Sequence, residues 1–157
     1  MKIRKANKKD VNIIAEIEHN SKYKNSELKK YQQTKDQTIE MIKEIFEKNS
    51  HDVYVLEEDN SSVGYFAVSF DKRKKTCYID YIAIKKKFQG KGLARKMMKK
   101  IESIAKRKKC NKIELNVWAK NYPAISLYTK FNFHVIDIMK NFYPNKDDKL
   151  KMRKYLD

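Results

Sequence analysis

Cysteine, glycine and proline are scarce in this chain of 157 residues, which contains two, three and two of them. The two cysteines, Cys77 and Cys110, lie far apart and form no Cys-x-x-Cys pair. The three histidines, His19, His51 and His134, are equally scattered. Metal sites built from cysteine and histidine need ligands at short, regular spacing. The sequence therefore predicts no metal site.

Long apolar runs are also missing. The first ten residues, MKIRKANKKD, lack the apolar core of a signal peptide, and no later run approaches the length that spans a bilayer. Two free thiols without an export signal suit a reducing compartment. We therefore expect a cytoplasmic protein with no membrane partner.

Acidic residues are too few to balance the basic ones. Lysine and arginine number 37 and aspartate and glutamate 20, which gives a net charge of +17. Arginine, which recognises phosphates and base edges with a bidentate fork, occurs at only five positions, and the lysines are spread along the whole chain. This distribution does not favour nucleic acid as a partner, although it should attract polyanionic ligands in general.

The hydrophobic pattern predicts one domain, residues 1–157, of the α/β (α+β) class. Apolar spacing alternates between periods of two and of about 3.6 residues, which indicates the element order β-α-α-β-β-β-α-β-α-β-β around a mixed, mostly antiparallel central sheet flanked by helices. The polar segment 22–33 is aperiodic and predicts a loop or an irregular helix. Thr34 and Gln37 form a capping-box pattern at the start of the second helix.

Two of the three glycines, Gly90 and Gly92, follow the apolar run 78–84 and precede a helical pattern that begins at Leu93. A strand that leads through glycines into a helix exposes backbone N–H groups at the positive end of the helix dipole, where a phosphate can approach. Lys91, Arg95 and Lys96 add cationic side chains nearby. The spacing fits neither a P-loop nor a dinucleotide-binding motif, because no Ser or Thr follows and Arg95 occupies the third glycine position.

Two separate segments resemble the GNAT superfamily of N-acetyltransferases. The first, Gln89-Gly90-Lys91-Gly92-Leu93-Ala94, is similar to the acyl-CoA motif Gln/Arg-x-x-Gly-x-Gly/Ala, with Lys87 at its outermost position. The second lies about thirty residues later and is similar to Asn-x-x-Ala-x-x-Leu-Tyr-x-x-x-Gly-Phe. Its matching residues are Asn121, Ala124, Leu127, Tyr128 and Phe133, and Asn132 replaces the glycine.

The resemblance implies acetyl-CoA as co-substrate. The backbone amides of Gln89 to Ala94 would hold the pyrophosphate, assisted by Arg95. The end of the preceding strand, at Ile82, Ala83 and Ile84, would bind the pantetheine and the acetyl carbonyl, in a wedge where two strands separate. On the second motif, the cofactor-binding positions are Asn121, Ala124 and Tyr128.

The resemblance also assigns Tyr128 as the general acid that protonates the coenzyme A thiolate. The general base is open: Tyr78 and Asp80 share one face of the strand before the glycines and are both candidates, each with the alternative of an ordinary half-buried strand residue. Asn116 occupies a position that is commonly glutamate in ribosomal-protein N-terminal acetyltransferases, and an amide cannot accept a proton.

The acceptor is expected to be a primary amine, either a protein N-terminus or lysine, or a small amine such as a polyamine or an antibiotic. The segment around Tyr143 resembles the region that lines the peptide channel of N-terminal acetyltransferases. Alternatives of another class are a basic nucleic-acid-binding protein and a non-catalytic acyl-CoA-binding regulatory domain. Analogy with the family suggests a homodimer.

Overall fold

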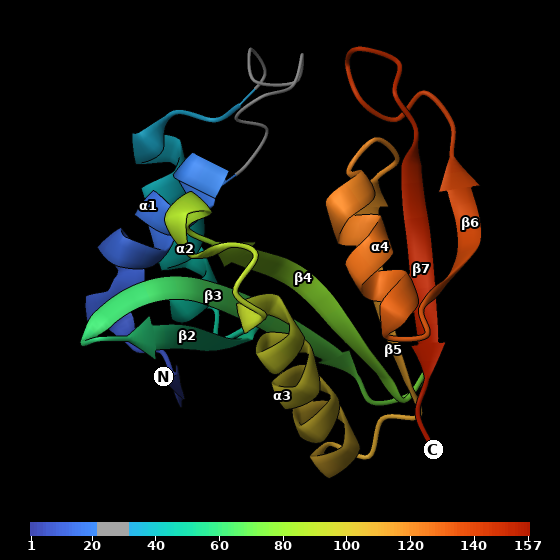
Figure 1. Cartoon of the computed structure of the whole chain (residues 1–157), viewed down its shortest axis with the longest axis horizontal. Coiled ribbons are helices and arrows are strands. Elements are labelled where there is room, and N and C mark those ends of the chain that lie inside the picture. The colour runs from blue at the N-terminus through green and yellow to red at the C-terminus, as the bar shows by residue number, and fades with distance from the viewer. Residues whose placement is uncertain (22–31) are drawn as a thin grey trace. The chain divides into compact units, whose positions relative to one another are not determined.

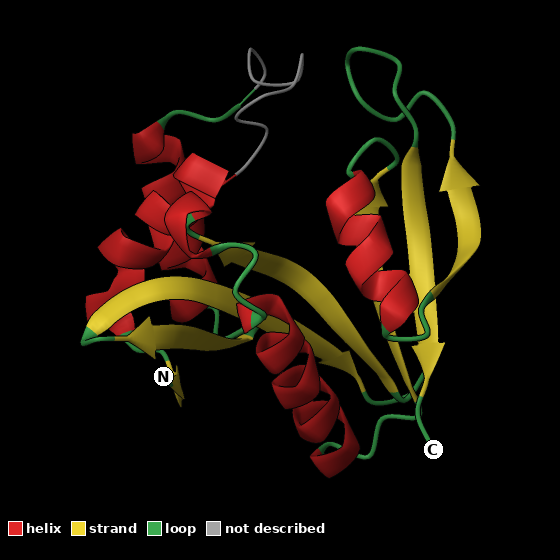
Figure 2. Ribbon diagram, viewed as in Figure 1, coloured by secondary structure: helices red, strands yellow, loops and turns green. Residues whose placement is uncertain are grey.

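A computed structural model describes residues 1–21 and 32–157 of the chain. Its described part contains four α-helices and a sheet of seven strands, ordered β1-β2-β3-β4-β5-β7-β6 (Figures 1 and 2). The succession of strands and helices confirms the predicted mixed fold and element order. Of the polar segment 22–33, residues 22–31 lie outside the described residues. The strands are β1 (Lys2–Lys5), β2 (Asp52–Glu58), β3 (Ser61–Asp71), β4 (Thr76–Ile84), β5 (Lys112–Trp118), β6 (His134–Met139) and β7 (Lys149–Tyr155). The helices are α1 (Val11–Ser21), α2 (Lys35–Glu47), α3 (Leu93–Arg107) and α4 (Tyr122–Lys130), with short 3-10 turns η1 (Lys8–Asp10) and η3 (Lys86–Phe88).

Residue contacts divide the chain into two compact units. Unit 1 comprises Met1–Ser69 and Tyr81–Leu93, and unit 2 comprises Phe70–Asp80 and Ala94–Asp157. Strands β3 and β4 therefore contribute residues to both units. In the described part of the chain, no helix combines the length and the apolar character that crossing a membrane requires.

Unit 1 is built on the pairing of α1 and α2, which lie side by side (Figure 1), and on the antiparallel strands β1, β2 and β3. Thr34 accepts a hydrogen bond from the Gln37 backbone and the Gln37 side chain accepts one from the Thr34 backbone, which confirms the predicted capping box of α2. Within the core, the Tyr65 hydroxyl donates a 2.6 Å hydrogen bond to the buried Glu18.

Unit 2 combines a parallel pair, β4 with β5, and an antiparallel set in which β7 lies between β5 and β6 (Figure 2). One face of α3 is apolar and buried, whereas its basic residues point outward, as the helical spacing predicts. The core of the unit includes Met97, Ile101, Ile104, Ile113 and Met152, each 1% exposed or less.

Candidate active site

Both glycines of the glycine loop, in unit 1, have a backbone conformation that favours glycine. Gly90 and Gly92 have φ angles of +75° and +74°, and α3 begins directly after them at Leu93. Apart from the glycine itself and its two chain neighbours, no heavy atom of the described residues lies within 4 Å of a Cβ built on either glycine, so the requirement for glycine comes from the positive φ rather than from lack of space. Alternating φ values of this kind direct successive N–H groups toward one point, as in anion-binding nests.

Gln89 anchors this loop. Its side-chain amide donates a 2.9 Å hydrogen bond to the Ile84 carbonyl at the end of β4, and its backbone N–H donates to the Lys86 carbonyl at 3.1 Å. That N–H of Gln89 is therefore already engaged within the loop. The first N–H groups of a helix such as α3 lack intrahelical partners and can donate to a phosphate.

Two lysine side chains lie over the ring of Phe88, next to the glycine loop. The Nζ atoms of Lys87 and Lys91 lie 5.0 Å and 5.1 Å from the centre of its ring. A cation over an aromatic face is held by the ring quadrupole, so the ring brings two ammonium groups to the glycine loop.

The third glycine, Gly64, lies on β3 next to the end of β4. The sequence analysis did not identify it as part of a site. A Cβ added to Gly64 on β3 would lie 2.9 Å from the Ala83 carbonyl oxygen and 3.2 Å from Cγ1 of Ile84. The Lys85 N–H donates to the Val63 carbonyl at 2.8 Å. Gly64 thus permits close approach of β3 to the residues predicted to bind pantetheine, Ile82–Ile84.

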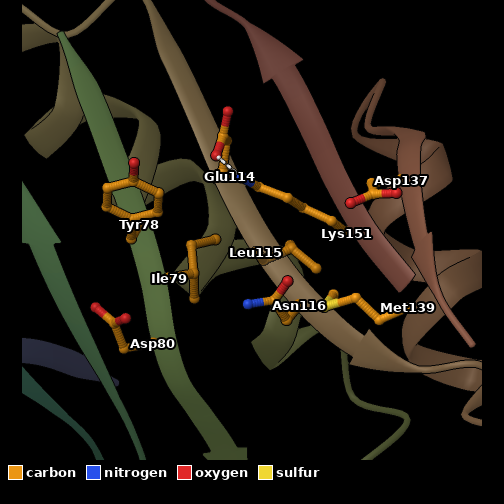
Figure 3. A pocket seen from close by; sticks show the side chains of 9 residues that line it. All are labelled: Tyr78, Ile79, Asp80, Glu114, Leu115, Asn116, Asp137, Met139 and Lys151. Atoms are coloured by element: carbon orange, nitrogen blue, oxygen red, sulfur yellow. Dashed lines mark ion pairs between the residues drawn. The ribbon is translucent and has the colours of Figure 1, made fainter. Parts of the chain in front are cut away.

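In unit 2, the parallel pairing of β4 and β5 is short. Its register runs from Thr76 opposite Lys112 to Ile79 opposite Leu115, whereas β5 continues to Trp118. A pocket of about 270 Å³ lies where this register ends (Figure 3). It is lined by Tyr78, Ile79, Asp80, Glu114, Leu115, Asn116, Asp137, Met139 and Lys151.

Both base candidates, Tyr78 and Asp80, line this pocket, and so does Asn116 (Figure 3). The sequence analysis missed Glu114, Asp137, Met139 and Lys151, which come from β5, β6 and β7. These residues meet because Lys151 is the register partner of both Asn116 and Asp137, a pairing between distant segments that no local pattern reveals.

Glu114 is the most deeply buried carboxylate of the pocket, with a side chain 3% exposed. It accepts hydrogen bonds from Lys151 at 2.9 Å, drawn in Figure 3, and from Arg153 Nε at 2.8 Å. Burial acts to raise the pKa of Glu114, but the hydrogen bonds from these two cations outweigh it and lower the pKa below its usual value. Glu114 is therefore a charged structural partner and a poor proton acceptor at neutral pH.

Tyr128 lies on α4 with 6% of its surface exposed, and its ring packs against Phe133 at 5.9 Å between centres. Burial raises the pKa of Tyr128 to about 12. The hydroxyl therefore remains protonated at neutral pH, which suits a proton or hydrogen-bond donor. Asn132, at the family's glycine position, has φ +64°, the left-handed conformation that its replacement of glycine requires.

Asn121 is the N-cap of α4. Its side-chain oxygen accepts a hydrogen bond from the Ala124 backbone at 3.4 Å, and Pro123 follows in the first turn. The cap uses the oxygen of the side chain and leaves its NH₂ group directed elsewhere, so Asn121 can act as a donor to a ligand while it starts the helix.

Tyr143 lies half-buried in the loop between β6 and β7 and is not among the residues that line the pocket. Two aspartates fix this loop. Asp147 accepts hydrogen bonds from Trp118 at 2.9 Å and from Lys120 at 2.7 Å, and Asp148 accepts one from Lys140 at 2.9 Å. The loop that carries Tyr143 is thus attached to the end of β5. Across residues 1–21 and 32–157, no cluster of three or more metal-binding side chains occurs.

Comparison with known proteins places the sequence among acetyltransferases. The profile of the Acetyltransferase (GNAT) family matches residues 14–133. A spermine/spermidine N(1)-acetyltransferase of Bacillus subtilis is 38% identical over 64 residues, which cover 40% of this chain and 42% of that protein. The chain thus matches less than half the length of that relative. An N-alpha-acetyltransferase of Saccharolobus solfataricus is 29% identical over 114 residues, 66% of this chain and 68% of that protein.

Among solved structures, a GNAT family acetyltransferase from Elizabethkingia anophelis with acetyl-CoA bound has a TM-score of 0.75 at 21% identity, over 99% of this chain and 97% of that one. This likeness shows the fold, and the family profile covers most of the sequence, including both motifs described above. The chain belongs to the Acetyltransferase (GNAT) family.

Proposed function

We propose that this protein transfers the acetyl group of acetyl-CoA to a primary amine, by direct attack of the amine within a ternary complex. The observation that carries the proposal is the pocket at the end of the β4–β5 register, which presents Tyr78, Asp80 and Asn116 in a protein of this family. The thioester supplies the activated acyl group. The protein has to hold it, receive a proton from the attacking ammonium and stabilise the departing thiolate.

The cofactor would be held by the glycine loop and the end of β4. The N–H groups from Gly90 to Ala94 and the ammonium groups of Lys87 and Lys91 supply donors and charge for the pyrophosphate, with Arg95 on the first turn of α3. Backbone groups of Ile82–Ile84 would bind the pantetheine and the acetyl carbonyl. The remaining cofactor-binding residues that we propose lie at α4: the Asn121 amide, Ala124 and Tyr128.

We assign the proton acceptor to Asp80, acting directly or through one water. Asn116 cannot accept a proton, and Glu114 is held in its charged form by Lys151 and Arg153. Asp80 lies on the same sheet face as Glu114 and Asn116, one strand away. Tyr78 lies beside it and remains the second candidate.

Tyr128 would act on the leaving thiolate. A phenol with a pKa of about 12 is a weaker acid than a thiol by about three to four pKa units, so complete proton transfer to the thiolate is uphill. Its contribution is then a hydrogen bond that stabilises the developing thiolate, with the proton itself supplied as solvent enters.

For the acceptor, we propose the α-amine of a polypeptide. The similarity to an N-alpha-acetyltransferase extends over two thirds of both chains, whereas that to the spermine/spermidine enzyme covers about two fifths. A small polyamine is the second candidate. It is favoured by two further carboxylates of the pocket lining, Asp80 and Asp137, beside Glu114, which is paired with Lys151 and Arg153.

The test is acetyl transfer from acetyl-CoA to three acceptors: a peptide with a free α-amine, the same peptide with a blocked α-amine and an internal lysine, and spermidine. We expect the free α-amine to give the highest kcat/KM. Transfer to spermidine alone would replace the peptide assignment by the polyamine one. Transfer to none of them, with intact acetyl-CoA binding by calorimetry, would contradict the proposed enzyme. A Gly92→Trp control should abolish binding.

A further inference from the structure

The tetrapeptide Lys-Arg-Lys-Lys occurs twice in the sequence, at residues 72–75 and 106–109. The first copy forms the turn between β3 and β4, and the second ends α3 and leads toward β5. All eight side chains are exposed. Although the copies are thirty-odd residues apart in sequence, both belong to unit 2.

In the fold, the two Lys-Arg-Lys-Lys segments lie next to each other. The backbone N–H of Asn111, just after the second copy, donates a 2.8 Å hydrogen bond to the Lys75 carbonyl at the end of the first. The ammonium of Lys108 lies 5.3 Å from the centre of the Phe70 ring, just before the first copy. Figure 1 shows the end of α3 and the start of β5 beside the C-terminus. Lys112, which begins β5, adds a ninth basic residue to this group, which we call the basic end.

Acidic side chains offset little of this charge. Asp71 lies in the same turn, where its carboxylate accepts a 3.0 Å hydrogen bond from the Lys74 backbone, and Asp157 ends the chain. Nine of the 37 basic residues of the sequence thus belong to this one group. The spread of the lysines along the sequence, which argued against nucleic acid, therefore does not exclude a local basic cluster.

An exposed aromatic pair adjoins the basic end. Tyr155, 60% exposed, is the register partner of Lys112, and its ring stacks on that of His134 with 6.1 Å between centres. The Arg153 guanidinium lies 5.7 Å from the Tyr155 ring and donates a 3.2 Å hydrogen bond to its hydroxyl. Exposed rings flanked by arginine and lysine are the elements that bind unpaired bases and the phosphates between them.

We propose that the basic end binds single-stranded nucleic acid, with the two Lys-Arg-Lys-Lys segments and Lys112 contacting phosphates and Tyr155 stacking on a base. The site is distinct from the glycine loop, because the residues of the basic end belong to unit 2 and those of the glycine loop to unit 1. Saturating coenzyme A should therefore leave the binding unchanged.

The test measures binding of a fluorescent oligouridylate of about 12 nucleotides to the full chain, by anisotropy, from about 50 to about 200 mM salt. The test variant carries Lys72→Gln, Arg73→Gln, Lys106→Gln and Arg107→Gln. The control carries Lys8→Gln, Lys9→Gln, Lys43→Gln and Lys48→Gln, four exposed lysines of unit 1 with the same total charge change. Four lost phosphate contacts should reduce the slope of log affinity against log salt by about three.

We expect the test variant to bind at least tenfold more weakly than the control at every salt concentration, and Tyr155→Ala to lose about tenfold in affinity with an unchanged salt slope. Equal losses in test variant and control would overturn the proposal, since binding would then follow net charge alone. Binding to vesicles rich in phosphatidylserine without binding to the oligonucleotide would overturn it in favour of a membrane surface. Equal affinity for a duplex of the same length would overturn the stacking role of Tyr155.

Discussion

The three glycines serve two different physical purposes. Gly90 and Gly92 supply positive φ angles in open space, just before α3 begins. Gly64 supplies the absence of a side chain, because the Ala83 carbonyl lies where its Cβ would be. A chain with so few glycines uses all three around the segment between β4 and α3.

Gly64→Ala should weaken acetyl-CoA binding by displacing the Ala83 carbonyl, since a contact of 2.9 Å forces the backbone of β4 to move. Overpacking of this kind costs roughly 1–3 kcal/mol. We expect both a lower melting temperature and an increased calorimetric Kd for acetyl-CoA. Ser62→Ala, two residues earlier on β3, is the matched control and should alter neither. An unchanged Kd for Gly64→Ala would mean that the end of β4 does not contact the cofactor.

Tyr128→Phe should reduce kcat by about 100-fold, the lower range for removing one hydrogen bond to charge that develops in the transition state, with KM for acetyl-CoA unchanged. Because the pKa of Tyr128 is raised to about 12, the phenol stays protonated up to about pH 10. Loss of activity on raising the pH from about 8 to about 10 is therefore not expected from this residue. A pH profile that falls in this interval in the native enzyme and is flat in Tyr128→Phe would contradict this view of its ionisation.

Asp80→Asn tests the proton acceptor. We expect a loss of about 100-fold in kcat/KM at neutral pH, partly recovered at alkaline pH where the amine is already deprotonated. Tyr78→Phe is the companion variant. If Tyr78→Phe shows the large loss and Asp80→Asn does not, the base is Tyr78.

Residues fixed by local chemistry were predictable, whereas those brought in by strand register were not. The glycine loop, the capping box of Thr34 and the left-handed Asn132 follow from backbone preferences that the sequence carries. Glu114 and Lys151 meet only because β7 pairs with β5, and Gly64 matters only because of the neighbouring strand. Such contacts depend on tertiary structure.

A buried carboxylate on β5, that of Glu114, links this strand to β7. Glu114 on β5 accepts hydrogen bonds from Lys151 and Arg153 on β7, and this arrangement places Lys151 in the pocket beside Asp137. The pairing thus serves the stability of the sheet and the composition of the pocket at the same time.

Glu114→Gln should lower the free energy of unfolding by about 1–3 kcal/mol, because the two cations are only partly buried. The pKa of Glu114 is lowered in the folded state, so its contribution is complete above about pH 5 and is lost as the pH falls through the folded pKa. The difference between native protein and variant, measured by urea unfolding, should therefore shrink from neutral pH toward about pH 3. A difference independent of pH would show that packing, rather than charge, accounts for the loss.

The element order was predictable because each helix and strand has a clear apolar period, as α3 illustrates with its buried stripe from Met97 to Ala105. The order of strands in the sheet was not, since β7 inserts between β5 and β6. Pairing of strands separated in sequence depends on tertiary contacts that a period of two does not specify.

For the whole molecule, the dominant property is its net charge of +17. Repulsion among like charges destabilises a compact chain, and salt screens it over a distance of about 10 Å at 0.1 M. We expect the melting temperature to rise when potassium chloride is increased from about 20 to about 200 mM. Local ion pairs, such as that of Lys48 with Glu44, would give the opposite sign. A melting temperature that falls with salt would show that such pairs outweigh the global repulsion.

The short register between β4 and β5 has a consequence for hydrogen–deuterium exchange. Pairing with β4 ends at Leu115, so amides of β5 beyond this residue that point away from β7 have no ladder partner from that register. Their deuterium uptake should be fast in the free protein and slow once a ligand occupies the adjacent pocket. Mass spectrometry of the peptide that contains Asn116–Trp118 would then report occupancy without any assay of turnover, and could rank acceptors that bind but react slowly.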